Sequence, residues 1–167
     1  MSILKKIVVY PLRWIDSMKT TIIRKRFSEC GSNLEVGGFP SISCPSRIKL
    51  GDNVNLNRSC VLNATDSNII IGNNCTISEG AMLLAATLDA TDYIYNHNKR
   101  HVSKPIILGD NVWVCAGAII CPGVKIAGGA IIAAGAVVTK DILDEDVLVA
   151  GNPAKVIKLY DDKQNHT

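Results

Sequence analysis

Residues 105–140 of the chain read PIILGDNVWVCAGAIICPGVKIAGGAIIAAGAVVTK. An aliphatic residue returns at every sixth position, namely at Leu108, Val114, Ile120, Ile126, Ile132 and Val138, with Gly or Asn recurring in between. Six residues fit neither the helical repeat nor a simple alternation, but they suffice for one short strand and a tight corner. Three such edges close a triangular coil of about eighteen residues, so the stretch predicts a parallel β-helix with stacked aliphatic side chains.

The composition agrees with a single domain that has a narrow core. Of the 167 residues, 47% are hydrophobic but only 5% are aromatic. This is too apolar for a disordered chain, and no uninterrupted apolar run reaches the roughly 18 residues of a membrane-spanning helix. A triangular tube accommodates aliphatic residues and Cys but leaves little room for aromatic rings. We therefore expect a mainly β solenoid of hexapeptide repeats, with Cys60 and Cys75 as small core residues.

The six-residue register also occurs earlier in the chain and is interrupted by one long insertion. The register is present in residues 50–61 and 71–82, and nineteen extra residues separate Leu83 from Leu108. Long excursions from a compact repeat are usually functional. We therefore expect residues 85–104 to protrude as a polar loop, which contains two of the three histidines.

The two ends of the chain differ from the repeats. Residues 1–27 contain seven Lys or Arg and one Asp, and their aliphatic residues recur at roughly helical spacing. Residues 1–28 are therefore expected to form a basic amphipathic helical element before a β-helix domain of residues 29–152. Two interpretations stay open: a helix that contacts anionic lipid, and a helix that caps the open end of the β-helix. Residues 153–167 stop the hexads and are expected to be a C-terminal tail.

Three kinds of site are disfavoured by the sequence. The six cysteines lack a CxxC motif and the N-terminus lacks a signal-peptide pattern, which favours free thiols in a reducing cytosol. Only His97 and His101 lie in one region, without a third nitrogen ligand, so no metal site is expected. The basic residues are concentrated at the N-terminus and the aromatic residues form no stacking series, so we expect no nucleic-acid binding.

The most specific blocks are residues 104–113, the Pro122-Gly123-Val124 corner, residues 134–141 and residues 150–157. In this order they resemble the left-handed parallel β-helix, hexapeptide-repeat acyltransferases. Within that family they resemble the sugar O-acetyltransferase branch, which includes maltose, galactoside and capsule or lipopolysaccharide acetyltransferases. The resemblance covers roughly residues 50–158. It implies a left-handed triangular β-helix, a homotrimer with active sites in the grooves between subunits, and acetyl-CoA as the acetyl donor.

The resemblance also implies which residues line the donor site. An extended pantetheine chain would lie along the C-terminal coils, close to small corner residues, with lysines near its phosphates. Small residues also suit tight corners and lysines also suit a solvated surface, so the structural and binding roles are compatible. The matching positions in this chain are Trp113, Ala116, Ala134, Thr139, Lys140, Lys155 and Lys158.

The catalytic position departs from the family's pattern. The sugar acetyltransferases use a histidine as general base, and the matching position here is Leu88, followed by the expected acid Asp89. Leucine cannot accept a proton. Three explanations stay open: His101 or His97 reaches the same groove from the protruding loop, the substrate supplies its own basic group, or the chain has lost the chemistry. We favour His101, because it stands four residues before the coil resumes at Pro105, where the rigid body can position it.

The sequence thus predicts an acetyl-CoA-dependent O-acetyltransferase that acts on a hydroxyl of a sugar or glycan precursor and needs no metal. His101 is the first choice for the base and His97 the second, with Asp89 and Asp92 as candidates to orient the imidazole and the substrate. The enzyme would be cytoplasmic, at the inner membrane face if residues 1–28 contact lipid. The alternatives are an N-acetyltransferase on an amino sugar, a serine O-acetyltransferase, and a catalytically inactive β-helix that serves as a binding or assembly subunit.

Overall fold

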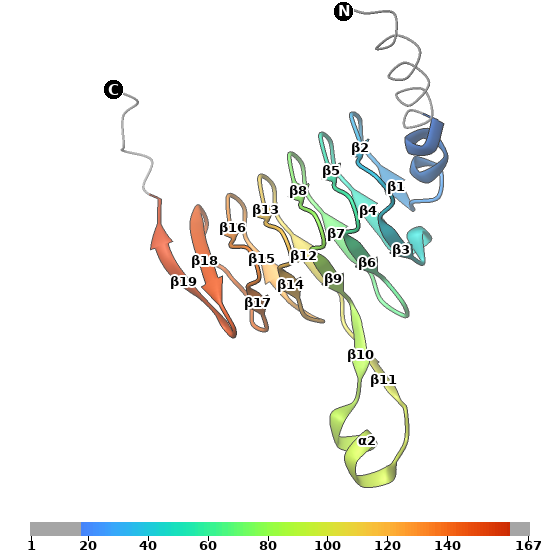
Figure 1. The fold of residues 1–167 in the computed structure, drawn as a ribbon, viewed down its shortest axis with the longest axis vertical. Helices are drawn as coiled ribbons and strands as arrows, with labels where there is room; N and C mark the ends of the chain where they lie inside the picture. The colour runs from blue at the N-terminus through green and yellow to red at the C-terminus, as the bar shows by residue number, and fades with distance from the viewer. Residues whose placement is uncertain (1–17, 161–167) are drawn as a thin grey trace, which may run out of the picture.

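The computed structural model describes residues 18–160, which form a prism of three parallel sheets with one projecting arm (Figure 1). Residues 18–24 are helical, and the expectations for residues 1–17 and 161–167 lie outside the described part of the chain. In spatial order, the first sheet contains β1 (Glu29–Cys30), β4 (Ile48–Leu50), β7 (Ile69–Ile71), β12 (Ile106–Leu108) and β15 (Lys125–Ile126). The second sheet contains β19 (Ala154–Leu159), β18 (Val147–Gly151), β16 (Ile131–Ile132), β13 (Trp113–Val114), β8 (Thr76–Ile77), β5 (Asn55–Leu56) and β2 (Glu35–Val36). The third sheet contains β17 (Val137–Val138), β14 (Ile119–Ile120), β9 (Met82–Leu84), β6 (Val61–Asn63) and β3 (Ser41–Ser43), and one 3-10 turn, η1 (Pro45–Arg47), follows β3.

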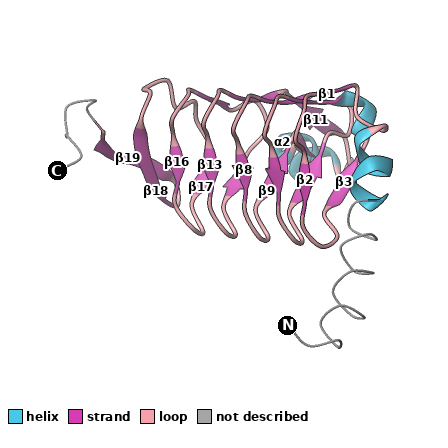
Figure 2. Ribbon diagram, turned by 90° about the horizontal axis from the view of Figure 1, so that it is seen from above, coloured by secondary structure: helices cyan, strands magenta, loops and turns pink. Residues whose placement is uncertain are grey.

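The strands pair in the register that the hexads predict. Leu108 of β12 pairs in parallel with Ile126 of β15, and Ile120 of β14 pairs with Val138 of β17, so both residues pair with the residue eighteen positions later. Each coil up to β17 contributes one strand of two or three residues to each sheet, and Figure 2 shows the coils stacked in one direction. The predicted parallel β-helix is therefore confirmed.

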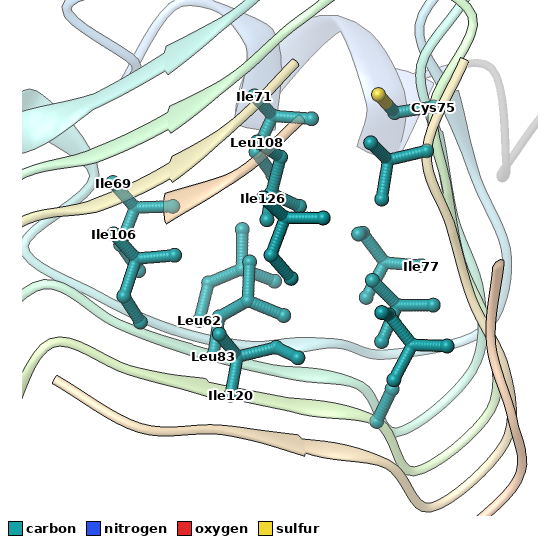
Figure 3. Close-up of a cluster of buried hydrophobic side chains, with 14 of the residues drawn as sticks. Leu62, Ile69, Ile71, Cys75, Ile77, Leu83, Ile106, Leu108, Ile120 and Ile126 are labelled. Carbon is teal, nitrogen blue, oxygen red and sulfur yellow. The ribbon is translucent and has the colours of Figure 1, made fainter. Parts of the chain in front are cut away.

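The interior of the prism consists of columns of aliphatic side chains. Leu62, Leu83 and Ile120 come from three successive coils, pair in register and are fully buried (Figure 3). Phe27 is the one aromatic residue among the buried side chains of residues 18–160. The thin aliphatic core that the low aromatic content predicts is thus confirmed.

Two cysteines belong to this core. Cys60 and Cys75 are fully buried, and burial raises the pKa of both thiols to about 11. They act as small apolar residues, as predicted, because a thiol with such a pKa stays protonated at neutral pH. All six cysteines are free, and Cys44 is exposed.

A ladder of asparagines lines the corner between the first and second sheets. Asn33, Asn53, Asn74 and Asn111 all adopt a left-handed backbone conformation, with φ between 54° and 59°. Asn tolerates this conformation better than most residues, which explains its recurrence at this corner. Successive side chains are hydrogen-bonded from Nδ2 to Oδ1 at 2.9, 2.9 and 3.1 Å. The same residues therefore form the corners and hold neighbouring coils together.

An arm leaves the stack between β9 and β12. Its two strands, β10 (Ala86–Leu88) and β11 (His101–Ser103), pair in antiparallel fashion and carry the helix α2 (Ala90–Asn96) between them. At its base, the backbone N–H of Lys104 donates to the carbonyl oxygen of Ala85 at 2.9 Å. Figure 1 shows the arm extending well beyond the prism. The protrusion predicted for residues 85–104 is confirmed, as a ribbon with a helix rather than as an irregular loop.

Both ends of the described chain lie against the terminal coils. Ile23 and Phe27 pack against the core at the N-terminal end. At the other end β19 pairs in antiparallel fashion with β18, so the segment from residue 153, expected as a tail, opens with a six-residue strand. No helix within residues 18–160 is long and apolar enough to span a bilayer.

Replacing Leu83 with Ala should lower the free energy of unfolding by about 2–5 kcal/mol, because it opens a cavity between two occupied layers. Urea unfolding followed by circular dichroism, at one fixed protein concentration, measures this loss. Ile94→Ala on the arm is the control, since Ile94 is 62% exposed and its replacement should cost under about 0.5 kcal/mol. Equal losses at the two positions would contradict the core that we describe.

Candidate active site

One edge of the prism, between the third and first sheets, carries the arm; we call it the arm edge. The side chain of Lys104 lies against Gly123 on the next coil, where an added Cβ would approach Lys104 Cδ to 3.0 Å. Gly123 also has a φ of +87°, which disfavours any other residue. Thr139 and Lys140 follow β17 on the coil after that and are exposed. The arm edge therefore brings the base of the arm together with two of the residues predicted for donor binding.

The arm places His101 directly opposite Leu88. The two residues are register partners in the β10–β11 ladder. Opposite residues of an antiparallel pair project from the same face of the ribbon, with Cβ atoms about 5 Å apart. Both side chains are exposed. The imidazole is thus presented beside the position where the resemblance predicts a histidine.

The other candidate base, His97, lies at the outer end of the arm. It is the C-cap of α2, with a left-handed backbone at φ 51°, and its backbone N–H donates to the carbonyl oxygen of Asp92. Its side chain is exposed. Of the two candidates, His101 is the one carried by the paired strands that join the prism.

The carboxylates of Asp89 and Asp92 hold the arm together through Arg100. Asp89 is the N-cap of α2, accepts hydrogen bonds from the backbone N–H groups of Thr91 and Asp92 at 3.0 and 3.2 Å, and also accepts one from the Arg100 guanidinium. Arg100 Nε lies 3.7 Å from Asp92 Oδ2. The hydrogen bond from Arg100, together with those from the backbone, lowers the pKa of Asp89. These partners tie both acids to the residue next to His101 rather than to the imidazole itself.

The edge between the second and third sheets carries small residues at its corners; we call it the alanine edge. Ala116 and Ala134 occupy equivalent corners of consecutive coils and are exposed, and the N–H of Gly135 donates to the carbonyl oxygen of Ala116 at 3.0 Å. Beside them Trp113 is 49% exposed, and its Nε1 donates to Ser78 Oγ at 2.9 Å. This bond holds the indole on the outer surface of the second sheet.

The register also aligns Trp113 with one of the predicted lysines. Trp113 pairs with Ile131, Ile131 with Leu148, and Leu148 with Lys158, so the four residues form one row across the second sheet. Three strand spacings of about 4.8 Å make this row about 14 Å long. Lys155 lies on the same last strand and, like Lys158, is exposed. The row therefore suits an extended ligand with an anionic end.

Within one subunit the predicted residues do not converge on one site. Thr139, Lys140 and His101 belong to the arm edge, whereas Ala116 and Ala134 belong to the alanine edge, with the third sheet between them. The outward side chains of that sheet, aligned by register, are mostly apolar: Ser41, Val61, Met82, Ile119 and Val137. An apolar outer face is typical of a surface that another chain covers.

Two residues of the site are absent from the sequence-based prediction. Arg100 binds both acids of the arm, and Ser78 fixes Trp113. Arg100 could have been noticed as the neighbour of His101 in a loop with two acids, but no spacing in the sequence points to Ser78. Among residues 18–160, no group of three or more His, Cys, Asp or Glu side chains is placed to hold a metal ion.

Comparisons with known proteins agree with this geometry. A family model described as "Bacterial transferase hexapeptide (six repeats)" matches residues 105–140. The galactoside O-acetyltransferase of Escherichia coli (strain K12) is 32% identical over 152 residues, which cover 89% of this chain and 71% of that protein. The chain belongs to the hexapeptide-repeat acetyltransferases.

Two solved structures place this acetyltransferase beside the sugar O-acetyltransferases. A maltose O-acetyltransferase from Clostridium difficile 630 has a TM-score of 0.80 and 29% identity, with 87% of this chain and 76% of that chain covered. A galactoside acetyltransferase in complex with coenzyme A has a TM-score of 0.81 and 31% identity, with 87% and 72% covered. The branch that the sequence resembles is therefore confirmed.

Asp89→Ala should loosen the arm of this acetyltransferase more than Asp89→Asn, because Asn still caps α2 while Ala removes both the cap and the ion pair. We expect amide hydrogen exchange in β10 and β11 to be about two- to thirtyfold faster in the Ala variant. Since the pKa of Asp89 is lowered, its contribution is complete at neutral pH and is lost only as the pH falls below the usual range of carboxylates. Unchanged exchange in the Ala variant would show that Asp89 does not hold the arm.

Proposed function

We propose that this acetyltransferase transfers the acetyl group of acetyl-CoA to a hydroxyl of a sugar or glycan precursor, with His101 as the general base. The similarity to galactoside and maltose O-acetyltransferases, one of them solved with coenzyme A, supports the donor and the class of acceptor. The observation that carries the role of His101 is its pairing with Leu88 across the arm. A donor of this kind also supports a cytoplasmic location.

His101 has the chemistry that the transfer needs. A neutral imidazole accepts the proton of the acceptor hydroxyl as the hydroxyl oxygen attacks the thioester carbonyl carbon, and the imidazolium then returns a proton to the departing sulfur. The side chain of Leu88, opposite His101, is apolar and cannot accept a proton. Asp89 and Asp92 act as positioning residues, because they hold Arg100, the residue that precedes His101.

The alanine edge and the row of the second sheet are the proposed donor site. Ala116 and Ala134 leave room for an extended chain close to the backbone, with Trp113 as one wall. Lys155 and Lys158 are exposed on the last strand, where their ammonium groups can meet phosphates. Thr139 and Lys140 contribute from the arm edge.

We also propose a homotrimer, in which the arm edge of one subunit meets the alanine edge of its neighbour. The separation of the predicted site residues by the third sheet supports this arrangement, because it lets one composite groove collect both sets. The mostly apolar outward face of that sheet, which includes Val61, Met82, Ile119 and Val137, supports it too. Each trimer would then hold three equivalent sites.

His101→Ala should lower kcat at least about a hundredfold, because the acceptor hydroxyl loses its base. Release of the coenzyme A thiol, with maltose and galactosides as first acceptors, measures the rate. His97→Ala is the matched control and should retain nearly the full rate, since His97 lies at the outer end of the arm. Full activity in both variants would rule out His101 as the base, and absence of both coenzyme A binding and turnover in every form would refute the enzyme itself.

Mixing two inactive variants tests the composite groove. His101→Ala removes the base from the arm edge, and Ala134→Trp fills the alanine edge, so each variant alone should be inactive. In a mixed trimer one of the three grooves combines an intact arm edge with an intact alanine edge. About three quarters of the trimers are mixed on equal co-expression, so about one quarter of the wild-type rate should return. No recovery in mixed trimers of verified mass would place both sets of residues in one subunit.

A further inference from the structure

We propose that the N-terminal end of the prism is a docking surface for an anionic lipid bilayer. This goes beyond acetyl transfer and does not depend on it. The surface, which we call the basal patch, consists of the apolar side chains of Met18, Ile22 and Phe39 together with the cationic side chains of Lys25 and Arg26. It combines the two features by which proteins bind at the membrane interface, namely exposed apolar groups and a surrounding positive charge.

The apolar part of the basal patch is well exposed. Met18 is 45%, Ile22 60% and Phe39 82% exposed, although other large apolar side chains at this end, such as Phe27, are buried in the core. Phe39 is connected to the helical segment by Lys19, whose Nζ lies 5.1 Å from the centre of its ring. Exposed large apolar side chains that lie together, beside cationic ones, are typical of a binding surface.

The surface beside these groups is hollowed. One hollow is lined by Met18, Lys19, Ile22 and Ile23. A second hollow is lined by Ile23, Arg26, Pro40, Ile42 and Pro45. Ile23 lines both hollows and Arg26 lines the second, so Ile23 connects the apolar lining of the first hollow with Arg26.

The charges of the basal patch indicate that its partner is anionic. Residues 18–27 contain four Lys or Arg and no Asp or Glu, whereas residues 28–167 carry a net charge of −3. Arg24, Lys25 and Arg26 are exposed, and none of them forms an ion pair within residues 18–160. Because no acidic side chain of residues 18–160 forms an ion pair with Lys25 or Arg26, this end complements an anionic surface, and the apolar groups favour a bilayer over a soluble polyanion.

The test is co-sedimentation of the full chain with vesicles of phosphatidylcholine alone and with about 30% phosphatidylglycerol. We expect binding to the anionic vesicles only, and at least about tenfold weaker binding at about 0.5 M salt. Lys25→Glu/Arg26→Glu should weaken binding at least about tenfold, whereas Lys99→Glu/Lys125→Glu, which reverses as many exposed charges elsewhere, should weaken it much less.

The apolar groups need a separate pair of variants. Ile22→Ser/Phe39→Ser should also weaken vesicle binding severalfold, while Ile94→Ser/Tyr95→Ser, at similarly exposed positions on the arm, should not. All variants should keep the wild-type unfolding temperature, since none of these side chains is buried. Equal binding to neutral and anionic vesicles, no vesicle binding, or retention of an RNA oligomer in place of vesicles would overturn the proposal. Unchanged binding by Ile22→Ser/Phe39→Ser would overturn the apolar part of the basal patch.

Discussion

The stacking of like aliphatic side chains from coil to coil is the interaction on which the structure depends. Each strand has only two or three residues in most coils, which is too short to persist without buried neighbours above and below. Because every coil contacts only the adjacent ones, residues can be inserted at a corner without disturbing the columns. β7 pairs directly with β12, in full register, although the whole arm lies between them in the sequence.

This periodicity explains how much could be predicted from the sequence. A repeat of six leaves its mark on every coil, so the fold, the core positions of Cys60 and Cys75 and the presence of a protrusion could all be read from spacing. The inside of the arm has no repeat. The pairing of Leu88 with His101 depends on the length of α2, on the N-cap at Asp89 and on the ion pair between Arg100 and Asp89. None of these features produces a regular spacing in the sequence.

The filled core also determines where a site can lie. Columns of aliphatic residues fill the inside of the prism of residues 18–160, so a substrate has to bind on its outer surface. A groove needs an element that projects or a second subunit. The arm is such an element, and the mostly apolar outer face of the third sheet is the proposed contact with a second subunit. The distribution of the predicted residues over two edges is therefore compatible with the composite site that we propose.

The proposed role of His101 as the base has a consequence for the acceptor, because His101 lies on the strand opposite Leu88. With Leu88 at the position that resembles the family's histidine, the imidazole of His101 arrives from the facing strand, displaced by about 5 Å across the ribbon. In the proposed donor site the thioester position depends on the prism, through Trp113 and the alanine edge, and not on which strand of the arm carries the base. The acceptor hydroxyl has to lie between these two points. The proposed base, at this distance from the position of Leu88, therefore favours an acceptor whose orientation is set by the arm, where the side chains of Tyr93 and Tyr95 are exposed.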